Sequence, residues 1–71
     1  MPKEVEYLFK IDINKSNISE LEQIKGIGKI IAERIIKYRE ENGKFNNLND
    51  LLKVKGMSQK TFDKIKTKIK I

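Results

Sequence analysis

The sequence predicts an all-α domain of four helices, built from two copies of one helical unit and preceded by an extended segment. Three observations lead to this fold class: a repeat at a spacing of 30 residues, apolar residues at helical spacing in each copy, and alternating apolar residues near the N-terminus. Residues 1–13 are the predicted extended segment. Residues 14–71 are the predicted helical domain, with repeats at about 17–45 and 47–71.

The repeat is visible when "NISELEQIKGIG" (17–28) is placed over "NLNDLLKVKGMS" (47–58). Each copy opens with an asparagine suited to an N-cap and has an acidic residue three positions later, a pattern resembling a capping box. A short helix of about two turns should then run to the glycine stretch. Its predicted buried residues are Ile18, Leu21 and Ile24 in the first copy, and Leu48, Leu51, Leu52 and Val54 in the second.

A longer helix is predicted after each glycine stretch. The first runs from Gly28 to about Asn42, where Gly43 is suited to a C-cap, and Arg39 falls inside its apolar arc. We expect Arg39 to pack its stem at the edge of the core and pair its head there. The second runs from Ser58 to about Ile69. The apolar residues of these helices are Ile31, Ala32, Ile35, Ile36 and Tyr38, then Phe62, Ile65 and Ile69, with Lys60, Lys64 and Lys68 along one flank.

The N-terminal segment has a period of two, which predicts a strand between Val5 and Ile13. A lone strand cannot satisfy its backbone hydrogen bonds and needs a partner. The C-terminal "KIKI" (68–71) is the other alternating stretch. Pairing within the chain and pairing between two copies, which would make a homodimer, both remain open.

The length and composition of the chain limit the functions that it can have. A chain of 71 residues forms one small domain with little room for an active-site cleft. The absence of cysteine and histidine excludes disulfides and thiolate metal sites, and the carboxylates form no ligand cluster. We therefore expect no enzyme activity, no cofactor, no metal and no small-molecule substrate. No apolar run approaches the roughly 18 residues of a membrane span.

The net charge of +6 is unevenly distributed. Residues 1–52 carry nine basic and nine acidic side chains, whereas residues 53–71 carry seven lysines against Asp63 alone. A basic block of this kind favours a polyanionic partner, either nucleic acid or an anionic membrane surface. The alternative is a lysine face that only keeps the protein in solution.

The glycine stretch "IKGIGK" (24–29) predicts a phosphate-binding turn. Glycine tolerates the positive φ of a tight turn, which we assign to Gly26, and Gly28 leaves the following helix end open. Free amides and the helix dipole favour an anion there, and Lys25 and Lys29 flank it. The alternative is that both glycines serve only the turn. In the second copy Ser58 replaces the second glycine, and its hydroxyl can cap the helix.

These residues resemble a known family. "IKGIGK" with Ala32 four residues after Gly28 resembles the helix-hairpin-helix DNA-binding motif, and "IDIN", "LEQIKGIG", "IIKYREENGKF" and "DLLKVKGM" resemble the tandem domain of ComEA-type competence receptors over about residues 11–71. The resemblance implies binding of double-stranded DNA without sequence specificity, through hairpin amides on phosphates. The implied contact residues are Gly26, Ile27, Gly28, Lys29, Ile30, Gly56, Met57, Ser58, Gln59 and Lys60, with Lys25, Lys55 and Lys64 as supporting basic residues.

The resemblance leaves two other functions open. An extrinsic photosystem II subunit resembles the same tandem domain and is structural, so a scaffold or protein-interaction module without DNA binding is one alternative. A DNA-targeting module of a repair enzyme is the other. The family's receptors are held outside the cytoplasmic membrane by an upstream anchor, which implies an extracytoplasmic location if this chain is part of such a receptor.

Overall fold

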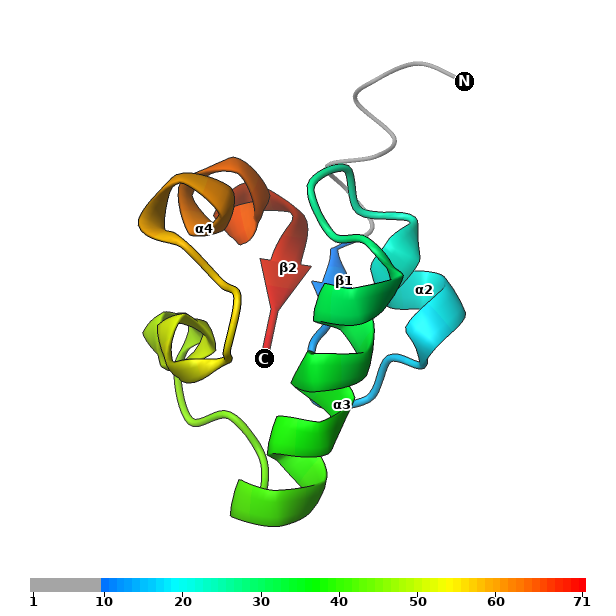
Figure 1. Ribbon diagram of the computed structural model, residues 1–71, viewed down its shortest axis with the longest axis vertical. Helices are drawn as coiled ribbons and strands as arrows, with labels where there is room; N and C mark the ends of the chain where they lie inside the picture. The colour runs from blue at the N-terminus through cyan, green and yellow to red at the C-terminus, as the bar shows by residue number, and fades with distance from the viewer. Residues whose placement is uncertain (1–9) are drawn as a thin grey trace.

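Residues 10–71, which the computed structural model describes, form three α-helices, two 3₁₀ helices and one two-stranded sheet (Figure 1). The predicted strand residues 5–9 lie outside this range. The predicted four-helix order is confirmed, with one of the four in 3₁₀ form. The elements are β1 (Ile11–Asp12), α2 (Ile18–Glu22), α3 (Lys29–Asn42), η1 (Leu48–Lys53), α4 (Gln59–Ile65), η2 (Lys66–Lys68) and β2 (Ile69–Lys70).

Helix α2 begins with the predicted capping box. The amide of Glu20 donates to Asn17 Oδ1 at 2.8 Å, and the amide of Asn17 donates to Glu20 Oε1 at 3.0 Å. These two bonds satisfy backbone donors that have no partner within the helix. Helix α2 therefore starts at the N-cap that the sequence predicts, Asn17.

The second repeat begins with a modified cap. Asn47 Oδ1 accepts from the amide of Asp50 at 3.2 Å, and the Asp50 carboxylate accepts from the amide of Asn46 at 3.2 Å. Partial burial acts to raise the pKa of Asp50, but the hydrogen bond from Asn46 and the ammonium of Lys53 at 3.4 Å outweigh it. The pKa of Asp50 therefore lies below its ordinary value of 3.8.

The predicted burial of Leu52 is wrong, and the helix type explains why. Element η1 is a 3₁₀ helix with about three residues per turn, so residues three apart share a face. Leu48, Leu51 and Val54 follow that spacing: the first is partly buried and the other two are fully buried. Leu52 falls on the next face and is 37% exposed.

Helix α3 has the predicted limits. Gly28 is its N-cap, and it ends at Gly43, whose φ of +83° suits a glycine C-cap and whose amide donates to Arg39 O at 2.9 Å. The Arg39 guanidinium donates to the carbonyl oxygens of Ile13 at 3.0 Å and Ser16 at 2.7 Å. The expectation that Arg39 packs and pairs at the edge of the core is confirmed.

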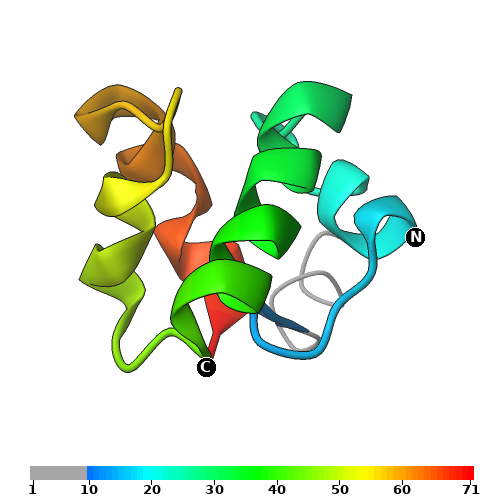
Figure 2. The same ribbon diagram turned by 60° about the horizontal axis from the view of Figure 1, so that its bottom comes forward.

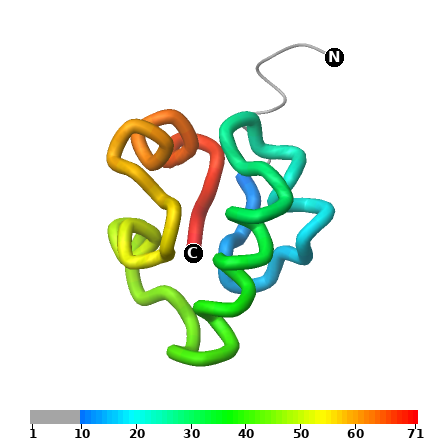
Figure 3. The backbone as a smooth tube through the Cα atoms, viewed as in Figure 1, coloured from blue at the N-terminus to red at the C-terminus, as the bar shows by residue number. Residues whose placement is uncertain are grey.

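The second long helix is shorter than predicted. It ends at Ile65, and the chain continues through η2 into β2. Strand β2 pairs in parallel with β1, with Ile11 opposite Ile69, and the Ile13 amide extends the pairing by donating to Lys70 O at 2.9 Å. The alternating "KIKI" therefore pairs within the chain, which buries Ile69 through a strand rather than a helix face. The backbone trace shows this last segment passing between the two repeats beside residues 10–13 (Figure 3).

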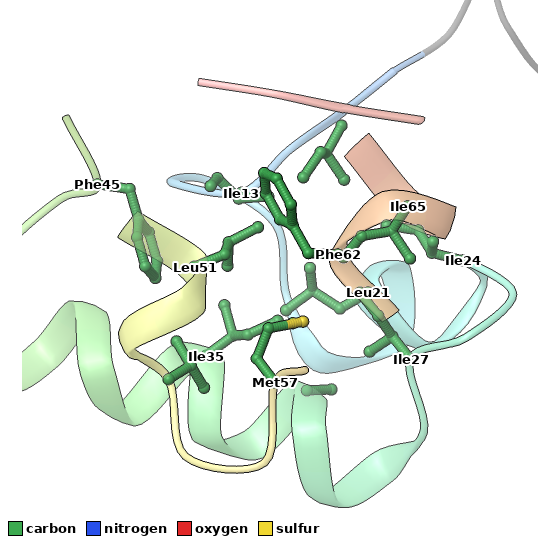
Figure 4. Close-up of a cluster of buried hydrophobic side chains, with 13 residues drawn as sticks. Ile13, Leu21, Ile24, Ile27, Ile35, Phe45, Leu51, Met57, Phe62 and Ile65 are labelled. Atoms are coloured by element: carbon green, nitrogen blue, oxygen red, sulfur yellow. The ribbon is translucent and has the colours of Figure 1, made fainter. Parts of the chain in front are cut away.

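The core is shared by both repeats. Side chains from α2, α3, η1 and α4 converge on one cluster, in which Leu21, Leu51 and Phe62 lie close to one another (Figure 4). The cluster also includes Ile13 and Ile69 from the sheet region. Since neither repeat encloses its apolar face alone, the two hairpins are held in one fixed arrangement.

Candidate nucleic-acid interface

The first glycine turn joins α2 to α3. The amide of Ile27 donates to Ile24 O at 3.0 Å, and between them Gly26 has a φ of +109°. A non-glycine residue is strained at this φ. A Cβ on Gly26 would also lie 3.4 Å from Ile65 Cγ2. Gly26 therefore serves the turn, as the sequence predicts.

The second glycine turn repeats this geometry. The amide of Met57 donates to Val54 O at 3.0 Å, and Gly56 has a φ of +93°. A Cβ on Gly56 would lie 2.6 Å from Arg34 Nη1 and 2.9 Å from Ile31 Cδ1. The second turn is thus packed against the first two turns of α3. Both glycine turns lie at the same end of the molecule, uppermost in Figure 2.

The helix end after the first turn is open. Gly28 has a φ of −92°, and no side chain caps α3. A Cβ on Gly28 would meet no atom within 4 Å. The first intrahelical bond runs from the amide of Ala32 to Gly28 O at 2.9 Å. The preceding amides of α3 have no partner within the helix and lie behind an exposed, unobstructed surface.

The helix end after the second turn is partly occupied. Ser58 Oγ accepts from the amide of Thr61 at 3.1 Å and donates to Thr61 Oγ1 at 3.1 Å. The two turns therefore share one backbone conformation but differ in what fills the helix end. The open end lies in the first repeat, and the end closed by a hydroxyl lies in the second.

The ten residues implied by the resemblance fall into two groups. Ile27 is 4% exposed and Met57 is 8% exposed, so their side chains belong to the core and only their backbones face the turn surface. Ile30 is 58% exposed directly beside the open helix end. Gly26, Gly28, Lys29, Gly56, Ser58, Gln59 and Lys60 are exposed as well, and so are the three supporting lysines, Lys25, Lys55 and Lys64.

Acidic residues are distributed selectively among the helix starts. Helix α2 and η1, which begin away from the glycine turns, carry Glu20 and Asp50 in their first turns. Helices α3 and α4, which begin at the glycine turns, carry no acidic residue in theirs. A carboxylate near a helix N-terminus is normally stabilising. Its absence at these two ends leaves their positive dipole ends uncompensated.

The sequence alone did not identify a groove beside the second turn. Arg34 and Lys37 of α3, together with Lys53 and Lys55, line a cavity of about 400 Å³. Arg34 Nη1 also donates to Lys55 O at 3.2 Å. The helical spacing of Arg34, Lys37 and Glu41 puts them on one face, but only the fold shows that this face meets η1.

Within residues 10–71, no group of three or more His, Cys, Asp or Glu residues could hold a metal ion. Among the helices of that part of the chain, none has the length and apolar character needed to cross a membrane.

Comparison with known proteins identifies the family to which the chain is similar. The family model for the helix-hairpin-helix motif matches residues 9–70. ComE operon protein 1 of Bacillus subtilis is 46% identical over 61 residues, which is 86% of this chain and 30% of that protein. A Haemophilus influenzae protein of unknown function is 39% identical over 61 residues, which is 84% of this chain and 54% of that protein.

A further relative is much longer. The transcriptional accessory protein Tex of Neisseria gonorrhoeae is 38% identical over 53 residues, which is 75% of this chain and 7% of that protein. The chain thus spans less than two thirds of each of these three relatives. The family match covers both glycine turns and the helices around them. The chain belongs to the helix-hairpin-helix family.

Proposed function

We propose that this chain binds double-stranded DNA without sequence specificity, through backbone phosphates at its glycine turns, as a non-catalytic module of competence-type DNA uptake. The observation that carries the proposal is the open N-terminus of α3 at Gly28, a helix end with no capping side chain and no steric obstruction. A phosphate oxygen can approach the free amides there, where the helix dipole favours negative charge. Lys25 and Lys29 flank this position and are exposed.

The helix starts at the two turns support an anionic partner. Both α3 and α4 lack an acidic residue in the first turn, whereas α2 and η1, the first helices of the two repeats, each have one. An anion from outside the chain would supply the missing negative charge. The second turn has the same backbone conformation and lies on the same side as the first, so one duplex can lie across both (Figure 2).

Phosphate contact accounts for the proposed lack of sequence specificity. Contacts to phosphate fix the position of a protein on a duplex but carry no information about the bases. At the first turn, the groups offered to DNA are backbone amides, two lysines and the exposed Ile30. Backbone amides on phosphate read no base edge, and the two lysines can pair with phosphates as point charges.

The role in DNA uptake rests on the likeness to ComE operon protein 1, of which this chain spans 30%. An extracytoplasmic location is part of the same proposal. A DNA-targeting module of a larger protein is the second candidate, because the chain matches only 7% of the Tex protein. Both candidates require DNA binding, whereas a structural module of the same fold does not.

Fluorescence anisotropy with several unrelated duplexes at two salt concentrations tests the proposal. If the chain neutralises about three to five phosphates, log K should fall against log salt with a slope of about −3 to −5. Affinities for the different duplexes should agree closely. Absence of binding at low salt would exclude DNA binding, and strong preference for one duplex would exclude the non-specific version.

A further inference from the structure

A basic groove lies between α3 and the chain that leads into the second glycine turn. We define it by five charged residues: Arg34, Lys37 and Glu41 of α3, and Lys53 and Lys55 opposite them. Its volume is about 400 Å³, and Tyr38 and Val54 complete its wall.

The groove gathers four cations against one carboxylate. Lys53 is paired with Asp50 at 3.4 Å. Within residues 10–71, the ion pairs are Lys53 with Asp50 and Lys66 with Asp63, so no carboxylate of that range forms an ion pair with Arg34, Lys37 or Lys55. Like charges held around a concave surface repel one another and raise the local concentration of anions. The groove is therefore suited to an anion from outside the chain.

The positive end of the groove is fixed beside the second turn. Lys55 directly precedes Gly56, and its carbonyl accepts from Arg34 Nη1 at 3.2 Å. Arg34 is also the side chain that a Cβ on Gly56 would strike first. Glu41 lies seven residues farther along α3 than Arg34, about 10 Å at the helical rise. The carboxylate is thus at the far end from the turn.

We propose that Arg34, Lys37 and Lys55 bind a phosphate of the DNA strand that passes the second turn, adding a contact beyond the two helix ends. The proposal rests on the proposed function, because the anion is taken to be part of the same duplex. Continuity favours a DNA strand, since Lys55 belongs both to the groove and to the second turn. Arg34 presents a planar fork that suits a phosphate, and Lys37 and Lys55 add point charges.

Lys37→Gln tests the groove contact, with Lys15→Gln as its matched control. Both lysines are exposed, and both variants remove one positive charge. The segment that contains Lys15 lies at the opposite end of the molecule from the glycine turns (Figure 2). Loss of one phosphate contact should make the salt slope shallower by about 0.9 and lower affinity about fivefold at 0.15 M salt. Lys15→Gln should change both quantities far less.

Glu41→Gln is the complementary variant. We expect it to raise duplex affinity, and misfolding cannot produce such a gain. Removal of the carboxylate at the far end of the groove should raise duplex affinity about twofold at low salt. These measurements use the full 71-residue chain and the same unrelated duplexes, with thermal unfolding to show that each variant is folded. A loss with Lys37→Gln, a gain with Glu41→Gln and an unchanged Lys15→Gln constitute the expected result.

Two outcomes would contradict the proposed groove contact but leave the proposed function standing. In the first, the wild-type chain binds DNA, but Lys37→Gln and Lys15→Gln have the same affinity and salt slope. In the second, Lys37→Gln weakens the binding of inorganic pyrophosphate, used as a free-anion probe, but leaves duplex binding unchanged. Failure of the wild-type chain to bind any duplex would overturn the proposed function itself.

Discussion

The side-chain amide of Asn14 forms two hydrogen bonds with the backbone of Phe45, which lies 31 residues later in the chain. Asn14 Nδ2 donates to Phe45 O at 3.0 Å, and Asn14 Oδ1 accepts from the Phe45 amide at 2.7 Å. The Phe45 ring is buried and stacks on Tyr38 with ring centroids 4.9 Å apart. One asparagine therefore ties the segment before α2 to the junction between the two repeats.

Asn14→Ala should destabilise the fold. The substitution leaves the amide and carbonyl of the buried Phe45 without their partners, so the free energy of unfolding should fall by about 1–3 kcal/mol. Urea denaturation followed by circular dichroism measures this change. Asn42→Ala is the control: its side chain makes one exposed bond to Tyr38 O at 3.2 Å, so its loss should cost less than about 0.5 kcal/mol. Equal losses would contradict the assigned role of Asn14.

Alanine substitutions should separate the two glycines of the first turn. Gly26→Ala places a side chain at a φ of +109° and should cost about 1–3 kcal/mol of folding free energy. Gly28→Ala adds a Cβ that meets no atom within 4 Å at an ordinary φ, so its cost should be that of a poorer N-cap, less than about 1 kcal/mol. Thermal unfolding of both variants is the measurement. A large loss of stability in Gly28→Ala would mean that Gly28, too, serves the turn.

Gly28 and Ser58 are the N-caps of α3 and α4. Exchanging these two residue types should exchange the stability and the DNA affinity of the two helix ends. Gly28→Ser offers a hydroxyl to the free amides of α3, as Ser58 does to Thr61 in α4, and should raise stability by a few tenths of a kcal/mol while weakening duplex binding. Ser58→Gly should lower stability by a similar amount and leave DNA affinity equal or tighter. Anisotropy and thermal unfolding measure both variants. Clear loss of affinity in Ser58→Gly would show that the serine itself contacts DNA.

The stabilisation from Asp50 should depend on pH in a defined direction. Its pKa in the folded chain lies below the ordinary value of 3.8, so its carboxylate stabilises the fold above that pH and loses this effect as pH falls through the folded-state pKa. Asp50→Asn should therefore lower the Tm at pH 7, and the difference should disappear well below pH 3.8. A difference in Tm that persists in strong acid would indicate that packing rather than charge is responsible.

Much of the fold could be predicted from the sequence because the repeat carries local signals. The asparagine caps, the positive-φ glycines and the Gly28 helix start are each determined by residues within a few positions of one another. The end of α4 could not be predicted from the sequence, because "KIKI" fits both a helix and a strand. Its pairing with β1, which is distant in the sequence, makes it a strand. Leu52 was misplaced because a helical wheel assumes 3.6 residues per turn, whereas η1 is a 3₁₀ helix.

The candidate site was predicted in part for the same reason. The turns are local and could be recognised in sequence, as could the capping hydroxyl of Ser58. The basic groove could not, because it forms only where α3 meets the chain before Gly56, about 20 residues away in sequence from Arg34. The Arg34 contact with Lys55 has no local signal, since it depends on how the two repeats pack.

The central claim is that a phosphate binds at the open end of α3, and Gly28→Asp tests it most directly. The variant places a carboxylate where the phosphate is proposed to lie, and like charges in contact cost several kcal/mol, so duplex affinity should fall about 100-fold or more. Lys44→Gln changes the net charge by the same amount and should bind nearly as well as the wild type, because the segment between α3 and η1 that contains Lys44 lies at the opposite end of the molecule from the glycine turns (Figure 2). Circular dichroism must show both variants folded. Unchanged duplex affinity in folded Gly28→Asp would contradict the account.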